Sequence, residues 1–131
     1  MLNRMLAGAA ALALVFAAAE VRAGANDYRF EAAGPPQKTQ AGKSVVPVRL
    51  VHVPDGKPVP SAVIFESKAD MGPAGMADMG APIQALGESA PGVYRFEVQP
   101  GMAGKWALHL AAKIQGEAET VRGSVVVELV K

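Results

Sequence analysis

The sequence contains no cysteine, few aromatic residues and almost no net charge. The lack of cysteine excludes a disulfide-stapled scaffold, a thiolate metal site, a cysteine nucleophile and lipidation on cysteine. The 13 basic and 12 acidic residues give a formal charge of +1, which provides no electrostatic reason to bind nucleic acid or an anionic membrane surface. A chain of 131 residues supports one domain rather than a large multidomain enzyme.

Catalytic sequence patterns are also missing. None of the serines lies in a Gly-x-Ser-x-Gly setting, and no carboxylates are paired at a recognisable spacing. The sequence has no His-x-x-x-His motif, no phosphate-binding loop and no dinucleotide fingerprint. We therefore do not expect the protein to be an enzyme.

Long apolar sequence is confined to the N-terminus. Arg4 provides a positive start, and Leu6–Ala19 is an uncharged run that is shorter than the roughly 20 residues needed to span a bilayer as a helix. Val21–Ala23 then has the small-residue spacing of a cleavage site. We interpret residues 1–23 as a signal peptide and residues 24–131 as a formally neutral, periplasmic domain.

The rest of the chain is divided by glycine and proline into short runs of alternating apolar and polar residues, which is typical of a small all-β domain. This pattern predicts an all-β fold, an immunoglobulin-like antiparallel β-sandwich of about seven strands. Pro47 lies inside one of these runs and has no N–H to donate, which predicts that its strand lies at a sheet edge or contains a bulge. The strands are expected within Asp27–Glu31, Ser44–Val53, Ser61–Ser67, Val93–Gln99, Trp106–Ala111 and Val121–Val130.

The segment Lys68–Gly80 interrupts this pattern and contains three of the six methionines, Met71, Met76 and Met79. Its glycines and proline predict a loop, and a long loop in a compact domain is usually functional or disordered. Thioethers are soft ligands that favour Cu(I), and by extension Ag(I), and they need no deprotonation. The loop is therefore a candidate Cu(I) or Ag(I) site, and the alternative is that its methionines are pliable apolar cover for one end of the sandwich.

Other side chains are candidates of second rank. His52 and His109 are the only histidines; imidazole binds copper, but a single histidine on a strand is more often a surface or hydrogen-bonded residue. His109 is out of phase with its apolar neighbours and should point away from the core. Met102 is either a fourth thioether ligand or, as we favour, a cap on the core. Trp106 is in phase with Leu108, which favours a core anchor over a cation–π contact to bound Cu(I).

Four segments in this order resemble the YtkA-like/FixH-like domain family: Asp55–Val63, the pair Asp70-Met71, Pro91–Phe96 and Met102–Trp106. The order and spacing carry the resemblance, since no single motif is specific. The resemblance implies an immunoglobulin-like sandwich on the outer side of the cytoplasmic membrane.

The same resemblance implies a function close to heavy-metal efflux or copper-oxidase assembly, with an efflux adaptor or pump as partner. Many relatives have a histidine beside methionine in the loop, whereas Lys68–Gly80 contains none. FixH-type members usually keep a membrane anchor, and the cleavage site expected here favours the efflux-associated branch. The rival interpretation is a structural or docking domain whose methionine loop is an apolar contact surface for such a partner.

We predict that the mature protein begins at Gly24 or within a residue or two of it, because the apolar run is too short to span and is followed by a cleavage site. Intact-mass measurement of periplasmic material checks this prediction. A mature chain that still contains Met1–Ala23 would contradict it.

Overall fold

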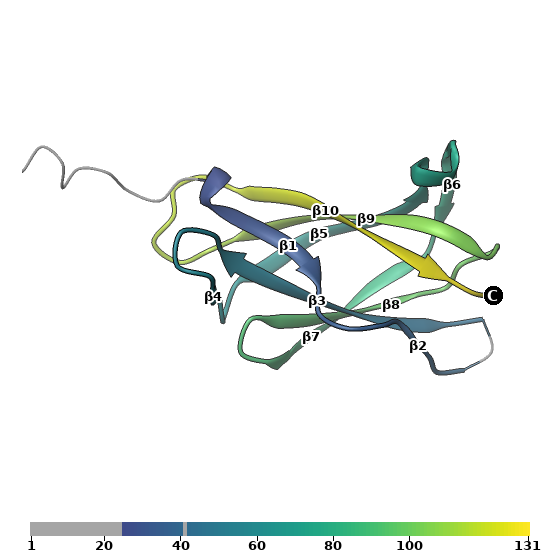
Figure 1. The fold of residues 1–131 in the computed structure, drawn as a ribbon, viewed down its shortest axis with the longest axis horizontal. Coiled ribbons are helices and arrows are strands. Elements are labelled where there is room, and N and C mark those ends of the chain that lie inside the picture. The colour runs from purple at the N-terminus through teal and green to yellow at the C-terminus, as the bar shows by residue number, and fades with distance from the viewer. Residues whose placement is uncertain (1–24, 41) are drawn as a thin grey trace, which may run out of the picture.

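The computed structural model describes residues 25–40 and 42–131, and this part of the chain forms two antiparallel sheets packed face to face (Figure 1). One sheet has the strand order β1-β3-β8-β7, with the short strands β2 and β4 also paired to β3. The other has the order β10-β9-β5-β6. The predicted immunoglobulin-like antiparallel β-sandwich is confirmed. The expected signal peptide, residues 1–23, lies outside the described residues.

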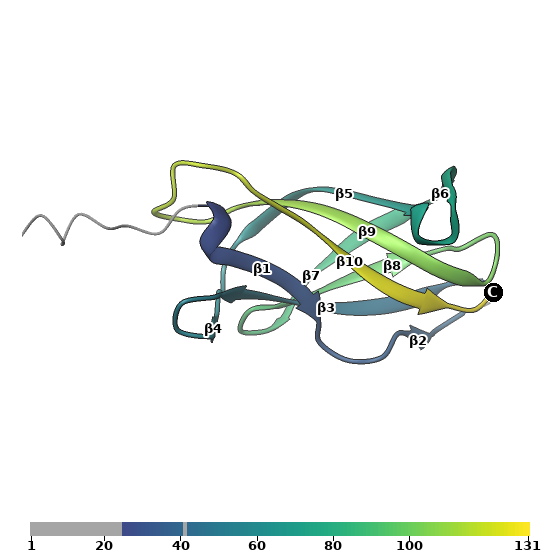
Figure 2. The ribbon, with the colours of Figure 1, turned by 45° about the horizontal axis from the view of Figure 1, so that its top comes forward.

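The connections between consecutive strands are short, and all strand pairs are antiparallel. The central pairs, β3 with β8 and β5 with β9, join strands that are not consecutive in the chain. A second view shows β1 lying beside β10, so the edges of the two sheets come together on this side of the sandwich (Figure 2). Within the described residues, no helix has the length and apolar character needed to cross a membrane. The elements are η1 (Ala25–Asp27), β1 (Tyr28–Ala32), β2 (Gln37–Lys38), β3 (Ser44–His52), β4 (Lys57–Pro58), β5 (Val63–Met71), η2 (Gly72–Ala74), β6 (Met76–Ala81), β7 (Ile83–Ala90), β8 (Val93–Val98), β9 (Gly104–Lys113) and β10 (Val121–Leu129).

The core lies between the two sheets and follows the alternation of the sequence. Tyr94, Phe96 and Val98 of β8 are buried, as predicted, and so are Trp106 and Leu108 of β9. Side chains two residues apart on a strand share a face, so each of these strands presents one apolar row to the opposite sheet. The other core residues include Phe30, Val46, Val48, Leu50, Leu110, Val121, Val125, Val127 and Leu129.

Trp106 is fully buried, which confirms its predicted role as a core anchor. Its indole Nε1 donates a hydrogen bond to the main-chain oxygen of Met102 at 3.0 Å, so burial leaves the polar end of the ring satisfied. The bond also ties the β8–β9 connection to the core.

Tyr94 links the two sheets where the chain crosses from one to the other. Its hydroxyl donates to the main-chain oxygen of Val59 at 2.6 Å and accepts from the N–H of Ala62 at 3.0 Å. Both partners lie in the connection between β4 and β5, which belong to different sheets. Burial raises the pKa of the Tyr94 hydroxyl above its usual value, so the neutral form that makes both bonds is favoured.

Three expectations about local structure need correction. Pro47 lies in β3, an internal strand rather than an edge. The carbonyl of Pro47 accepts a hydrogen bond from the N–H of Ala33 at 2.9 Å. Ala33 follows the last residue of β1, so the carbonyl and the nitrogen of Pro47 point to the gap between β1 and β2 rather than to a paired strand. The missing N–H of proline therefore falls where no neighbouring strand requires it.

The other two corrections concern segment boundaries. The interval Lys68–Gly80 is not a continuous loop, because β5 continues through Met71 and β6 begins at Met76. The interval before Val93 contains a further edge strand, β7, which the sequence pattern missed. β7 is exposed along most of its length, and its pairing with β8 is interrupted by two register shifts.

We predict that Trp106→Ala lowers the free energy of unfolding by about 3–5 kcal/mol, because the substitution leaves a large cavity between the sheets. Chemical denaturation of the two proteins measures this change. Val126→Ala is a matched control on the neighbouring strand, since Val126 is exposed and its loss should cost within about 0.5 kcal/mol. A loss well below a kilocalorie for Trp106→Ala would contradict the core assignment.

Candidate metal-binding hairpin

The hairpin between β5 and β6 lies at one end of the sandwich (Figure 1), and its strands contain Met71, Met76 and Met79. It turns through η2 and then through Gly75, which adopts the left-handed conformation at φ 82° and donates its N–H to the carbonyl of Gly72 at 2.8 Å. The register places Asp70 opposite Gly80 but Met71 opposite Met76. Three residues of β6 therefore bulge out of the ladder, which makes this edge irregular.

Met76 and Met79 lie on this irregular edge, with exposed fractions of 37% and 36%. Together with Gly75, Ala77 and Asp78 they line a hollow on the surface. Both side chains are therefore exposed to solvent, on a strand that has a neighbour on one side only. The sequence pattern predicted a loop for these two methionines, whereas the structure places both on strand β6.

Met71 is placed differently from the expectation that all three methionines occupy one loop. It ends β5 on the inner face and is 1% exposed. Its Cε lies 2.8 Å from the position that a Cβ on Gly104 would occupy, so the absence of a side chain at Gly104 leaves room for the buried thioether. A ligand role for Met71 would require this end of the core to open.

Met102 lies in the connection between β8 and β9, two residues before Gly104. It is 40% exposed, and the favoured interpretation of Met102 as a cap on the core stays a prediction. Because Gly104 contacts Met71, the connection that carries Met102 is at the same end of the sandwich as the β5–β6 hairpin. Four methionines thus gather at one end of the domain, one of them buried and three exposed.

His109 points away from the core, as predicted, and is held by two hydrogen bonds. Its Nε2 lies 2.9 Å from Asp70 Oδ2, and its Nδ1 lies 2.8 Å from Ser124 Oγ. Both imidazole nitrogens are engaged by protein, which fits the hydrogen-bonded interpretation better than that of a metal ligand. Asp70 and Ser124 were not singled out as partners in the sequence analysis, and the only signal for them was their place on the outward phase of their strands.

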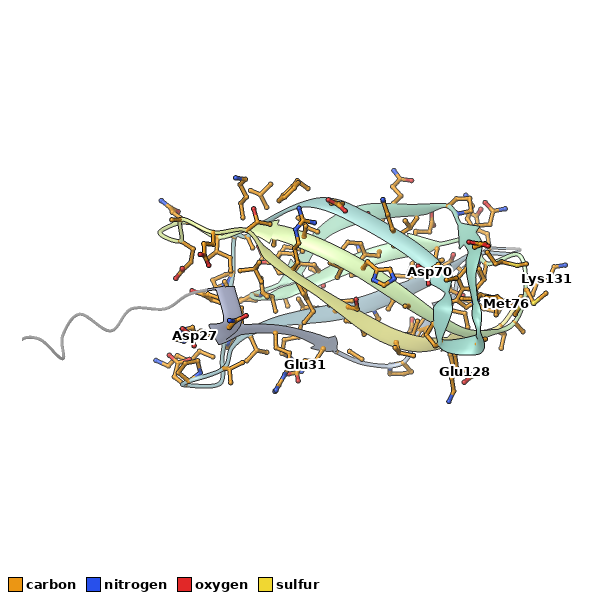
Figure 3. All side chains as sticks on the ribbon, turned by 90° about the horizontal axis from the view of Figure 1, so that it is seen from above. Asp27, Glu31, Asp70, Met76, Glu128 and Lys131 are labelled. Carbon is orange, nitrogen blue, oxygen red and sulfur yellow. The ribbon has the colours of Figure 1, made fainter. Side chains whose placement is uncertain are left out.

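His52 lies far from the methionines, at the end of β3 that pairs with β4. Its Nδ1 is 3.0 Å from Asp55 Oδ1, and its ring packs against Tyr28 with centroids 5.1 Å apart. A hydrogen bond from the Lys57 N–H and the contact with His52 lower the pKa of the Asp55 carboxyl. Figure 3 shows the two ends of the domain, with Asp27 at one and Met76 at the other. The structure therefore does not bring His52 to the methionine hairpin.

The arrangement defines a β-sandwich domain with four methionines at one end. In the described part of the chain, no group of three or more histidine, aspartate or glutamate side chains could hold a metal ion. Three exposed methionines lie at this end, and thioether sulfur in general favours Cu(I) over hard cations.

The chain belongs to the YtkA-like family, which matches residues 22–111. The FixH-like part of the resemblance stays a prediction. A crystal structure at 2.09 Å resolution of a DUF4426 family protein from Pseudomonas aeruginosa PAO1 is similar in fold, with 17% sequence identity and a TM-score of 0.46. The similarity covers 70% of this chain and 76% of that one. No curated protein matches the sequence.

We predict that Tyr28 titrates well above an ordinary tyrosine. Partial burial and the hydrogen bond that its hydroxyl donates to Glu117 Oε2 at 2.9 Å raise its pKa to about 12. In the unfolded chain the pKa is about 10, so the folded state holds this proton more tightly. The stability that it contributes is present below about pH 10 and is lost as the pH rises toward 12.

Thermal unfolding of the wild type and of Tyr28→Phe measures this effect. The wild type should be the more stable below about pH 10, and the difference should shrink above it. Tyr94 is present in both proteins and cancels in the comparison. A constant difference from pH 8 to the alkaline limit, or an ultraviolet titration of Tyr28 near its unfolded value, would contradict the prediction.

Proposed function

We propose that this protein is a periplasmic metal-handling protein that binds or delivers Cu(I) or Ag(I) through Met76 and Met79. The observation that carries the proposal is the exposure of these two thioethers on the bulged edge strand β6. Met102 is a third candidate ligand because it is exposed at the same end of the domain. His52 and His109 are not part of the proposed site, since His52 lies at the end of β3 that pairs with β4 and both ring nitrogens of His109 are hydrogen-bonded.

The chemistry of the hairpin supports this assignment. Thioether sulfur is a soft, neutral donor, so it binds Cu(I) or Ag(I) without losing a proton and keeps its ligating form in mildly acidic conditions. It also stays usable in an oxidising compartment, where paired thiols tend to form disulfides. An exposed site with few donors leaves the ion open to ligands of another protein, which suits delivery rather than permanent storage.

The expected context is heavy-metal efflux. Membership of the YtkA-like family supports this expectation through the resemblance described above. The partner would be an efflux adaptor or pump, and any association with the membrane would run through that partner. The low net charge of the chain favours neither nucleic acid nor a lipid surface as a ligand.

The alternative is a docking domain that binds no metal. The same exposure supports it, because Met76, Met79 and Met102 form an apolar, conformationally adaptable surface of the kind used for protein contacts. The two functions differ in what they require of the side chains. A contact surface needs apolar volume, whereas a metal site needs sulfur.

We predict that replacing Met76 and Met79 together by leucine abolishes Cu(I) affinity and leaves folding nearly unchanged. Leucine keeps the apolar volume at a small cost but offers Cu(I) no lone pair. Titration of the mature protein with Cu(I) against a competing chelator measures the affinity, and thermal unfolding measures the stability. Zn(II) should bind weakly to both proteins, since no cysteine is present and the two histidines lie apart.

Met71→Leu is the matched control. Because Met71 is buried, this variant should keep the Cu(I) affinity while losing up to about 1.5 kcal/mol of stability. Unchanged Cu(I) affinity in the Met76→Leu/Met79→Leu protein would remove the metal-site proposal and leave the docking domain as the better explanation. Loss of affinity in Met71→Leu alone would move the site into the core.

A further inference from the structure

A chain of hydrogen bonds on the outer face of the β10-β9-β5-β6 sheet leads to the methionine hairpin. It begins at Ser124 Oγ, 2.8 Å from His109 Nδ1, and continues from His109 Nε2 to Asp70 Oδ2 at 2.9 Å. The second carboxylate oxygen, Asp70 Oδ1, accepts the N–H of Gly72 at 2.8 Å. Gly72 is the first residue of η2, so the network ends on the backbone of the turn that leads into β6.

The register explains why these side chains meet. His109 is the partner of Ser124 on one side and of Lys68 on the other. Residues directly opposite each other in antiparallel strands share a face, and the diagonal neighbour is still within reach of a long side chain. Asp70 occupies that diagonal position, two residues beyond Lys68 on β5. The three strands β10, β9 and β5 therefore all contribute to holding one turn.

We propose that Asp70 is a positioning residue for the methionine site, held in turn by His109 and Ser124. This inference rests on the function proposed above. Asp70 uses one oxygen to fix the start of η2 and the other to anchor itself to the centre of the sheet. Met76 follows η2 and Gly75 directly, so the direction in which the hairpin presents Met76 and Met79 depends on how that turn is held.

The network can stay intact in either protonation state of His109. A neutral ring donates from Nε2 to Asp70 and accepts the Ser124 hydroxyl proton at Nδ1, whereas a protonated ring donates to both partners.

The experiment compares Asp70→Ala with Asp70→Asn in the mature protein. Alanine removes both hydrogen bonds. Asparagine keeps an oxygen for the Gly72 N–H, and its amide can donate to His109 Nε2 if the neutral ring donates from Nδ1 to Ser124. Asparagine therefore removes the negative charge and preserves the geometry, which separates positioning from simple attraction of a cation.

Glu66→Ala is the matched control. Glu66 is the acid in the next row of the same sheet face, where it binds Arg122 at 3.2 Å across the same three strands. Its removal deletes one surface carboxylate and one cross-strand bond without touching η2. Fluorescence of the buried Trp106 and circular dichroism confirm that each variant is folded.

Two readouts are taken at about pH 8, where the imidazole is ordinarily neutral. Amide hydrogen exchange without metal reports the order of the turn at Gly75 and Met76, and Cu(I) competition reports the affinity. Asp70→Ala should speed exchange at these amides by roughly tenfold, the factor expected for loss of a charged hydrogen bond. It should lower the Cu(I) affinity by a similar factor, whereas Asp70→Asn should restore both quantities most of the way and Glu66→Ala should change neither.

Each other outcome overturns the proposal in a distinct way. Unchanged exchange in Asp70→Ala would show that the network does not order the turn. Faster exchange with unchanged Cu(I) affinity would show that the ordering has no bearing on the site. Equal losses of affinity in Asp70→Asn, Asp70→Ala and Glu66→Ala would show that charge alone matters. If the wild-type protein fails to bind Cu(I), the proposed function falls and the positioning role falls with it, while exchange still reports whether the network orders the turn.

Discussion

The pairing of β5 with β9 is the constraint on which the rest of this structure depends. Its register sends Ala69 and Met71 into the core and Lys68 and Asp70 to the outer face. A slip of one residue would exchange the two faces, placing a carboxylate beside Trp106 and a thioether in solvent. The same pairing therefore decides what fills the end of the core and what holds the turn that carries the exposed methionines.

The strands that could be predicted from sequence are those whose inward positions carry bulky side chains. The alternation that includes Phe96 and Val98 predicted β8, and the alternation that includes Trp106 and Leu108 predicted β9. The last four residues of β5, Lys68–Met71, were missed because the inward residue Ala69 is small and because the glycines and proline after Met71 indicated a loop. The register partner of Ala69 is Leu108 of β9, so the neighbouring strand fills the volume that Ala69 leaves empty. β7 was missed because it is almost entirely exposed and has no buried row to create an alternation.

Part of the candidate site could be predicted from the sequence. Methionine is an uncommon residue, so the close spacing of Met76 and Met79 indicated a candidate site, and both side chains are exposed on one strand. The burial of Met71 could not be read from sequence, because it depends on β5 continuing past Lys68 and on the space left by Gly104, 33 positions later in the chain. The bond between His109 and Asp70 joins residues 39 positions apart, and only the register of two strands reveals it.

The irregularity of β6 has a consequence for the solubility of the folded chain. β6 and β7 are the two edge strands on the same side of the sandwich, and a flat edge presents a row of unpaired N–H and C=O groups to which another chain can add. β6 is broken by its bulge, and β7 by two register shifts and by Gly87 at φ 98°. Neither edge offers a long straight template, so a second copy that approaches this side finds few consecutive backbone partners. The bulge in β6, on which Met76 and Met79 are exposed, thus also obstructs edge-to-edge aggregation.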